Sequence, residues 1–297
     1  MPTTLKRYLI VLFSLYPCYL YAQVQTVRYP VRFSQYYTCY QLTNPAGIGA
    51  YSEFEASAGN KHYLGNFNKI STYYFNGGMR IASKGARINS SFSSIGILVY
   101  NDREGKYLNR SRYYAAYAWH GNITKTIKFS AGFHIGAMNY SVKGTPLSGD
   151  GSDTSPDGDI GVWFYNKNFH IGVSYNQIFN SKIQPLEEIA ALNSFVNIDG
   201  SCNFTIAKDI GILPSYSCRI PLKDDYYALD FSIGVSYKDK ITAIIGVHEN
   251  KNLINSFEIR NILSNNYPLN LNITYGYPFT RGGISTSFIE LGLSISH

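Results

Sequence analysis

The stretch Leu229-Asp-Phe-Ser-Ile-Gly-Val-Ser-Tyr237 alternates apolar and polar residues without interruption. Successive side chains of a β-strand point to opposite faces, so its large apolar residues share one face and Asp, Ser and Gly share the other. The same alternation returns at 169–175, at 269–277 and at 289–296, where it reaches the last residues of the sequence. The pattern predicts an all-β protein made of two-faced strands.

Alternating runs separated by polar turns predict thirteen strands, and we expect that at least one more is hidden. The runs are 52–58, 71–82, 93–100, 112–120, 127–139, 159–166, 168–176, 200–207, 228–237, 241–248, 254–262, 268–277 and 286–296. Single-chain bacterial barrels have even strand numbers and strands of roughly 10 residues. The count therefore favours a transmembrane antiparallel meander β-barrel of about 12 to 14 strands.

Short polar segments between the runs predict the turns. Those at 101–106, 223–225, 238–240 and 249–252 are rich in charged residues and Asn, and 166–168 predicts a tight hairpin. Two longer insertions, 143–159 and 178–199, are expected to be loops at a barrel mouth, with a helical turn at 186–192.

The N-terminus has the pattern of a cleaved secretory signal. Lys6 and Arg7 precede an apolar stretch, and Ala22 stands just before Gln23. We therefore expect a signal peptide at 1–22, an N-terminal segment at 23–50 that leads into the barrel, and the barrel itself at 51–297. Beyond residue 22 no stretch approaches the roughly 20 apolar residues of a spanning helix. If the chain spans a membrane, it does so as a barrel.

The composition also favours an outer-membrane location. The chain has 27 Tyr and 17 Phe, as expected for aromatic girdles at the membrane interfaces. Charged residues are 15% of the chain, against roughly 25% in soluble domains. The net charge of +7 is scattered, so no nucleic-acid partner is expected. A Tyr-rich secreted adhesin sandwich remains the non-membrane alternative.

The reactive residues do not form a recognisable catalytic, metal or cofactor motif. Five histidines fall on separate predicted strands and none accompanies a Gly-x-Ser-x-Gly elbow: His62, His120, His134, His170 and His248. Asp150, Asp153, Asp157 and Asp159 lack the spacing of an EF-hand. We expect no enzyme, metal or cofactor, although a Ser and a His from different strands would leave no motif. For Cys39, Cys202 and Cys218, a Cys202–Cys218 disulfide and three free thiols both remain open.

Several short motifs occur in an ordered series along the chain. Phe33-Ser-Gln-Tyr-Tyr leads to Asn44-Pro45-Ala46-Gly47, and Ile95-Gly96-Ile97 is followed by Asn101-Asp102 and Gly105 as a turn. The centre carries Pro156-Asp157, Gly161-Val-Trp-Phe-Tyr, Gly172-Val-Ser174 and then Pro214-Ser215, and Glu290 stands near the end. Asn44-Pro45 suits a turn into the first strand. Gly96, Gly161, Gly172 and Gly234 indicate close packing in a lumen or a bend in the wall, and a plug or ligand is an alternative occupant of the lumen.

In order and spacing, these motifs resemble the PorP/SprF family from about Phe33 to the C-terminus. These are outer-membrane barrel proteins of the type IX secretion and gliding-motility machinery of the Bacteroidetes. The chain departs from the family pattern at Gly47-Ile48-Gly49 and at Tyr275-Gly-Tyr-Pro278.

The resemblance implies a non-catalytic barrel in outer-membrane lipid. It also implies periplasmic ring or peptidoglycan-binding partners and a secreted cell-surface adhesin as a further partner. The alternative is a passive porin or transporter of small solutes.

Overall fold

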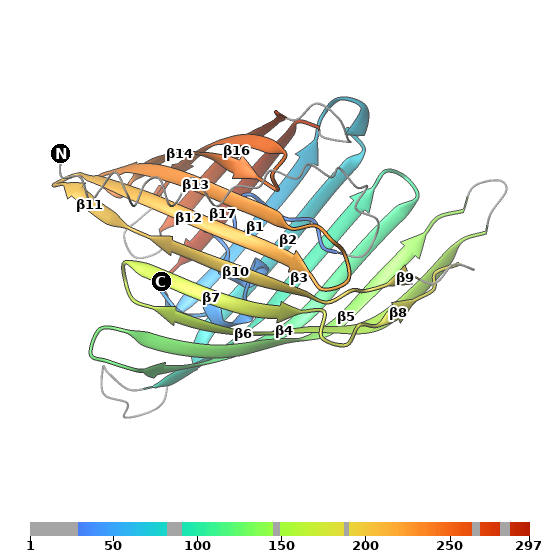
Figure 1. Ribbon diagram of the computed structural model, residues 1–297, viewed down its shortest axis with the longest axis horizontal. Coiled ribbons are helices and arrows are strands. Elements are labelled where there is room, and N and C mark those ends of the chain that lie inside the picture. Colours follow the sequence, from blue (N-terminus) through green and yellow to red (C-terminus); the bar gives the residue numbers. More distant parts are fainter. Residues whose placement is uncertain (1–28, 82–90, 145–148, 187–189, 263–267, 280–285) are drawn as a thin grey trace.

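The computed structural model describes residues 29–81, 91–144, 149–186, 190–262, 268–279 and 286–297. Fourteen antiparallel strands form a closed ring in which each strand pairs with its neighbours along the chain, and β1 pairs with β17 to close it (Figure 1). The strands are β1 (Phe54–Tyr63), β2 (Ile70–Ile81), β3 (Phe92–Glu104), β4 (Leu108–Asn122), β5 (Lys128–Val142), β6 (Gly151–Tyr165), β7 (Phe169–Asn176), β10 (Phe195–Cys202), β12 (Ile210–Pro221), β13 (Ala228–Tyr237), β14 (Ile241–His248), β15 (Asn252–Ile259), β16 (Leu269–Pro278) and β17 (Phe288–Ser296). The predicted all-β meander barrel is confirmed.

β11 (Phe204–Ala207) continues β10 along the same edge of β12 and in the same register. Two short strands lie outside this ring, where β8 (Lys182–Ile183) pairs with β9 (Ala190–Ala191) in a separate hairpin. Three short 3-10 helices complete the structure: η1 (Tyr40–Leu42), η2 (Pro45–Gly47) and η3 (Gly65–Phe67). No helix in the described part of the chain is long and apolar enough to cross a membrane.

The two ends of the barrel differ in the elements that they carry. β1 starts and β17 finishes at the same end, which we call the terminal end. The opposite end carries residues 177–186 and 190–194, between β7 and β10, and we call it the loop end. β3 to β6 have 13 to 15 residues, whereas β7 has 8. The last pair between β6 and β7 joins Asp159 to Asn176, so residues 151–158 extend the wall beyond β7 at the loop end.

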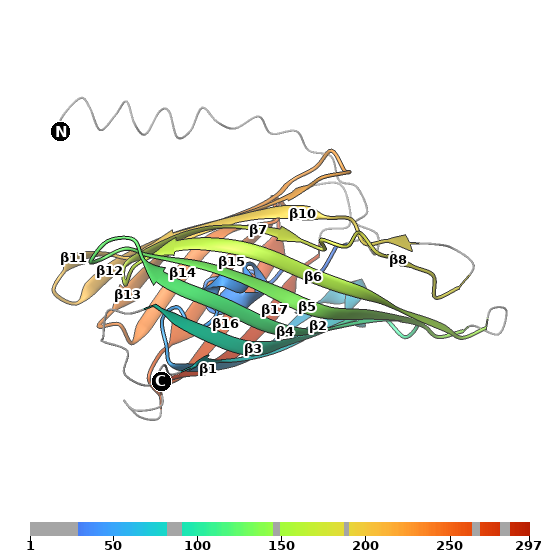
Figure 2. The same ribbon diagram turned by 90° about the horizontal axis from the view of Figure 1, so that it is seen from below.

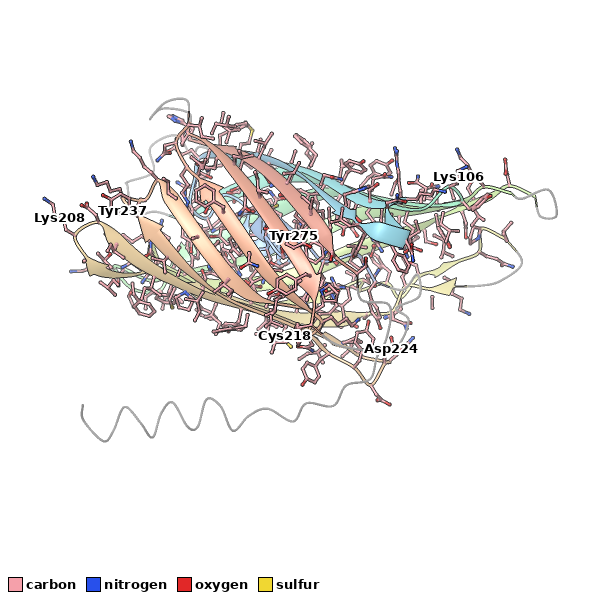
Figure 3. All side chains as sticks on the ribbon, turned by 90° about the horizontal axis from the view of Figure 1, so that it is seen from above. Lys106, Lys208, Cys218, Asp224, Tyr237 and Tyr275 are labelled. Atoms are coloured by element: carbon pink, nitrogen blue, oxygen red, sulfur yellow. The ribbon has the colours of Figure 1, made fainter. Side chains whose placement is uncertain are left out.

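The apolar faces of the strands point outward and the polar faces point into the barrel, which is the reverse of a soluble protein. On β13, Phe231, Ile233 and Val235 are 41 to 50% exposed on the outer surface, while Asp230 and Ser232 are 1% exposed in the interior. Figure 3 shows Tyr237 and Tyr275 on the strand-covered wall, with Lys208 and Lys106 at opposite ends. An apolar belt outside and a polar lumen inside are the pattern of a barrel that spans an outer membrane.

The structure corrects three sequence-based assignments near the loop end. The loop predicted at 143–159 is wrong for residues 151–159, which belong to β6. The loop predicted at 178–199 is wrong for residues 195–199, which belong to β10. Asn101 and Asp102 lie in β3 and the turn begins only at Gly105. β12 was not among the thirteen runs. Pro214 and Pro221 broke its pattern, because proline is rare within a paired strand.

The remaining turn assignments can also be compared with the structure. The hairpin at 166–168 is confirmed, with the Asn166 side chain accepting hydrogen bonds from the amides of Asn168 and Phe169. The helical turn predicted at 186–192 is absent from its described residues, where 190–191 are strand; residues 187–189 lie outside the described part. The predicted signal peptide, 1–22, also lies outside it.

All three described cysteines are free. Cys218 pairs with Ile198, four positions from Cys202, and this register separates the two thiols by roughly 13 Å along the strand. A disulfide requires Cα atoms within about 7 Å of each other. A Cys202–Cys218 disulfide is therefore excluded.

Residues 29–50 lie inside the ring of strands (Figure 2). We call this segment the plug. It includes η1 and η2, and its buried side chains form clusters with the inner wall, among them Phe33 with Tyr74 and Tyr100. The N-terminal segment therefore does more than lead into β1, because it fills the lumen.

Candidate functional site

The plug enters the lumen at the loop end. The Tyr29 hydroxyl donates to Asp224 Oδ2 at 2.6 Å, in the connection between β12 and β13. Arg219 on β12 donates to the carbonyl of Pro30 at 2.8 Å, and the Tyr100 hydroxyl donates to the carbonyl of Val31. Side chains of the wall thus satisfy backbone carbonyls of the incoming segment.

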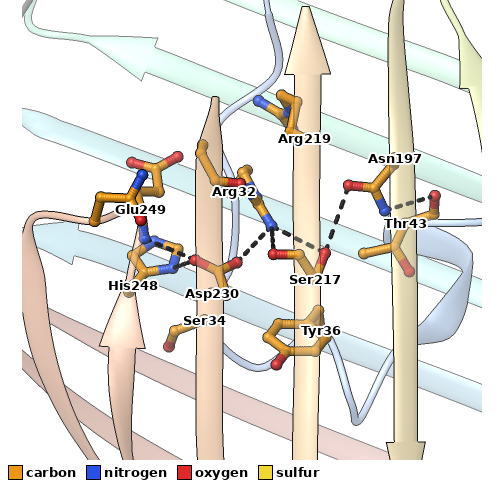
Figure 4. Close-up of polar contacts among 12 residues, drawn as sticks. Arg32, Ser34, Tyr36, Thr43, Asn197, Ser217, Arg219, Asp230, His248 and Glu249 are labelled. Carbon is orange, nitrogen blue, oxygen red and sulfur yellow. Dashed lines mark hydrogen bonds and ion pairs between the residues drawn. The ribbon is translucent and has the colours of Figure 1, made fainter. Parts of the chain in front are cut away.

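Arg32 fixes the next part of the plug to β12 and β13 (Figure 4). Its guanidinium lies 2.6 Å from Asp230 Oδ2 and donates to Ser217 Oγ at 2.9 Å. The other oxygen of Asp230 is 2.9 Å from His248 Nδ1. Breaking a buried ion pair leaves an uncompensated charge and costs about 3–5 kcal/mol, so this contact holds the plug strongly in place.

Glu290 on β17 binds the plug and also joins the strands that close the barrel. Its carboxylate accepts hydrogen bonds from the amide of Ser34, at 3.0 Å, and from the Ser34 hydroxyl, at 2.6 Å. Lys61 Nζ lies 3.2 Å from Glu290 Oε1 and donates to the carbonyl of Arg32 at 2.8 Å. Lys61 Nζ also lies 2.8 Å from His248 Nε2. Because His248 contacts Asp230, this joins the Lys61–Glu290 pair and the Arg32–Asp230 pair into one network.

The middle of the plug contacts opposite walls. The Tyr36 hydroxyl donates to Ser215 Oγ at 3.2 Å, and the Cys39 thiol lies 3.2 Å from Asn76 Oδ1 on β2. Burial raises the pKa of the Cys39 thiol to about 12 and raises that of Tyr36 above its ordinary range. Both groups are therefore neutral at physiological pH.

Asn44, Pro45 and Ala46 form a sharp turn that packs on the inner wall. Asn44 Oδ1 accepts the Ala46 amide at 3.0 Å, and Asn44 Nδ2 donates to the carbonyl of Val162 on β6 at 3.2 Å. Proline at the first position of η2 has its backbone angle already set for the helix. The sequence analysis expected this turn to lead into the first strand. In the structure the turn lies within the plug, and β1 begins only at Phe54.

Wall glycines make room for this turn. Gly132 and Gly161 are register partners on β5 and β6. A Cβ at Gly132 would lie 2.8 Å from the Pro45 carbonyl oxygen, and one at Gly161 would lie 2.1 Å from Asn44 Oδ1. Gly78 and Gly96 form a second pair, on which Ile48 packs. At these positions, glycine is required by the close approach of the plug.

The terminal-end half of the plug is held mainly through its carbonyls. Ser174 on β7 donates to the carbonyl of Thr43 at 2.7 Å, and Ser130 on β5 donates to that of Ala46 at 2.8 Å. Arg80 Nε on β2 donates to the carbonyl of Gly49 at 2.8 Å. The contacts with Asp224 at one end and Arg80 at the other show that the plug runs through the lumen from the loop end to the terminal end.

The structure brings together only some of the motif residues singled out from the sequence. Asn44 lies against Gly161 and Gly172, Ser174 donates to the carbonyl of the preceding Thr43, and Ser215 contacts Tyr36. Of the others, Gly105 lies in a turn with a positive φ of 71°, and Pro156 and Pro214 are strand residues. Asp102 and Asp157 face the lumen but bond to other wall residues, including Arg110 and Tyr114.

Sequence reasoning missed the charged network of Arg32, Lys61, Asp230, His248 and Glu290 as a functional unit. A signal was present, because Lys61, Asp230, His248 and Glu290 are charged or titratable residues on strands of a chain with few charges. A charge on the polar face of a barrel strand requires a partner in the lumen. The sequence does not indicate that the partners come from the plug.

Three wall residues form an arrangement that resembles a hydrolase triad. Ser201 Oγ is 3.1 Å from His170 Nδ1, and His170 Nε2 is 3.4 Å from Asp199 Oδ2. The imidazole is stacked on Trp163, with ring centroids 4.3 Å apart, and Trp163 Nε1 also donates to Asp199 at 3.0 Å. The amides beside Ser201 lie in the β7–β10–β12 pairing region, not in an oxyanion hole. This arrangement fits lumen packing better than acyl transfer.

Within the described ranges, no group of three or more His, Cys, Asp and Glu residues is arranged to hold a metal ion. Asp157 and Asp159, from the acidic segment considered as a calcium loop, are residues of β6. Asp159 is paired with His134 at 3.0 Å.

The comparison with known families decides the identity of the barrel. The model of the type IX secretion system membrane protein PorP/SprF matches residues 26–294, nearly the whole chain. The chain belongs to the PorP/SprF family. The resemblance inferred from the motifs is confirmed, and this PorP/SprF protein is a β-barrel of the outer membrane.

Solved outer-membrane barrels share the fold of this PorP/SprF protein. The toluene transporter TbuX of Ralstonia pickettii has a TM-score of 0.53 and 11% identity, with 86% of this chain and 93% of that chain covered. The monoaromatic hydrocarbon channel CymD has a TM-score of 0.51 and 9% identity, with 89% and 92% covered. No curated protein sequence matches the chain. The family and these neighbours are named for secretion and transport, not for catalysis.

Proposed function

We propose that this PorP/SprF protein is a non-catalytic, plugged barrel that anchors partners of the type IX machinery to the outer membrane. The partners would be periplasmic ring or peptidoglycan-binding components, or a secreted cell-surface adhesin. Anchoring requires a rigid body with accessible ends and no reactive group. The proposal rests on the plug, which is bound along its length to both walls.

The extension of the barrel wall at the loop end supports the same proposal. Residues 151–158 and their partners on β5 extend beyond β7, and β8 packs against this extension through Ile183. Its inner side is held by the cluster of Met138, Tyr140, Ile183 and Leu192. A rigid extension beyond the barrel offers a surface on which a partner can dock.

The test is affinity purification of the tagged protein from detergent-solubilised outer membranes, followed by mass spectrometry. We expect periplasmic components of the machinery or a large secreted adhesin, which should be absent when an unrelated tagged barrel is purified in the same way. Secretion and gliding should fail when the gene is deleted. Recovery of the barrel alone, with secretion intact in the deletion strain, would contradict anchoring.

Passive passage of small solutes is the second candidate, because the barrels of similar fold include a toluene transporter and a hydrocarbon channel. It predicts that the purified protein conducts in planar bilayers. Cys39 lies next to Asn76, so the Asn76→Cys variant can be cross-linked to lock the plug to β2. A solute channel would lose conductance after oxidation, whereas an anchor would keep its partners; Asn76→Ser is the matched control without a second thiol.

A further inference from the structure

A cavity remains between the plug and the wall in the loop-end half of the barrel. It offers about 50 Å³ to the centres of water-sized molecules, where one water needs roughly 10–15 Å³. Its lining includes three guanidinium groups, those of Arg32, Arg112 and Arg219, and one carboxylate, that of Asp159. The other polar side chains of the lining are uncharged, namely Tyr36, Tyr100, Tyr114, Gln41, Thr43, Asn176, Gln177 and Asn197. The cavity has room for a small group, not for a large apolar molecule.

Arg112 has unsatisfied hydrogen-bond donors in this cavity. Its side chain is 2% exposed, and its Nε and both terminal nitrogens have no hydrogen-bond acceptor among the described residues. The nearest carboxylate oxygen, Asp157 Oδ2, is 3.6 Å from Nε and already accepts the Tyr114 hydroxyl at 2.6 Å. Buried guanidinium donors without an acceptor carry a high desolvation cost.

Arg219 adds a second positive charge to the same cavity. It donates to the Pro30 carbonyl, but its Nε is buried without an acceptor, and no described carboxylate lies within ion-pair distance of it. Figure 4 shows its guanidinium beyond the Arg32–Asp230 contact. Unlike Arg32, Arg219 is not neutralised by a neighbouring acid.

The carboxylate in the lining does not supply the missing acceptor. Asp159 Oδ2 lies 3.0 Å from His134, and Asp159 Oδ1 accepts the Gln177 amide at 3.0 Å. The cavity therefore has an excess of positive charge and of unsatisfied donors. Guanidinium groups match the planar, bidentate geometry of carboxylates and the oxygens of phosphates.

We propose that this cavity binds a small oxyanion, a phosphate or carboxylate group, through Arg112 and Arg219. The anion joins β4 and β12 on the wall to plug residues 30–36 and 41–43, so its binding also fastens the plug. The small volume sets the size of the ligand at one such group, either free or at the end of a larger molecule.

Isothermal titration calorimetry on the detergent-solubilised protein tests the proposal with inorganic phosphate, acetate and dihexanoyl phosphatidic acid. Ionic strength is held constant, because surface charges respond to salt without a specific site. We expect at least one probe to bind. Arg112→Gln and Arg219→Gln should each weaken binding roughly 10- to 100-fold, since each removes charge-assisted hydrogen bonds.

Binding of free phosphate or acetate identifies a free anion, and binding of phosphatidic acid alone identifies a lipid headgroup. Arg103→Gln is the matched control, because Arg103 is exposed at the end of β3 and does not line the cavity. Heat-modified migration on gels shows whether each variant is folded. If Arg112→Gln does not fold, Arg112→Lys replaces it in the titration, because lysine keeps the positive charge. Absence of binding by the wild type, or equal binding by the wild type and both Gln variants, overturns the proposal.

Discussion

Lys61 and Glu290 face each other across the pair of strands that closes the barrel. They are register partners on β1 and β17, and Lys61 Nζ lies 3.2 Å from Glu290 Oε1. Both side chains are at most 1% exposed. Because Glu290 also accepts the amide and hydroxyl of Ser34, barrel closure and plug retention depend on the same carboxylate.

The Glu290→Gln variant should be strongly destabilised. It leaves Lys61 buried without its negative partner, which costs about 3–5 kcal/mol. The free energy of unfolding can be measured in urea by the fluorescence of the two tryptophans, one of which, Trp163, is buried against the plug. The Lys61→Met/Glu290→Met variant should be less destabilised than Glu290→Gln, and a loss below about 1 kcal/mol in Glu290→Gln would show that the ion pair is not needed.

A side chain at Gly132 should displace the plug. Valine there meets the backbone of Pro45 and Ala46 within 2.9 Å, so the plug must move. We expect Gly132→Val to raise conductance in planar bilayers and to make the plug sensitive to protease. Gly77→Val is the matched control, because its nearest neighbours lie 4.0 Å away. Equal conductance in both variants would mean that the plug tolerates the displacement.

The outward face of β13 should respond to charge according to depth. Ile233 lies in the middle of the strand, and Tyr237 lies at its end, beside the turn. Lysine costs about 2–4 kcal/mol at the bilayer midplane and about 0–1 kcal/mol near the interface. Unfolding in lipid vesicles should therefore show a much larger loss for Ile233→Lys than for Tyr237→Lys. Similar losses would place this wall outside the hydrocarbon core.

Cys39 should resist alkylation in the folded protein. Its pKa of about 12 lies above the ordinary 9.0, so the reactive thiolate is scarce at pH 8 and increases only as the pH approaches 12. We expect maleimide labelling, followed by mass spectrometry, to be roughly 1000-fold slower than in urea. Labelling of Cys39 at the unfolded rate would mean that the plug leaves the lumen. The Cys39→Ser variant identifies the labelled site.

Ser201 should not behave as a nucleophile. It lies near His170, but stacking on Trp163 fixes the imidazole and the neighbouring strands pair along this region. A fluorophosphonate probe should label the wild type and the Ser201→Ala variant equally, at background level. Labelling that depends on Ser201 would show an acyl-transfer site and refute the non-catalytic proposal.

The predictions from the sequence agree with the structure where neighbouring residues alone determine the conformation. The alternation in 228–237 predicted β13, and Asn166 predicted its hairpin, because strand faces and Asx turns are set by neighbouring residues. The predictions differ from the structure where the conformation depends on a contact with a residue far away in the sequence. Asn101-Asp102 has the composition of a turn, yet Asp102 is a lumen residue of β3 paired with Arg110 and bonded to Thr72.

The candidate site shows the same division. The glycines and Asn44-Pro45-Ala46 could be singled out from the chain, but the sequence did not place them against one another. Gly161 is 117 residues from Asn44, and Glu290 is 256 residues from Ser34. Contacts over such separations depend on the register of all fourteen strands and on the path of the plug.

By itself, the sequence determined the two-faced strands, the aromatic and weakly charged wall, and the family, because these depend on residue type and spacing along one chain. Only the tertiary structure decided that the polar face surrounds a lumen filled by residues 29–50. The physical reason is that Arg32, Lys61, Asp230 and Glu290 are too costly to bury alone, and closure of the barrel brings them together.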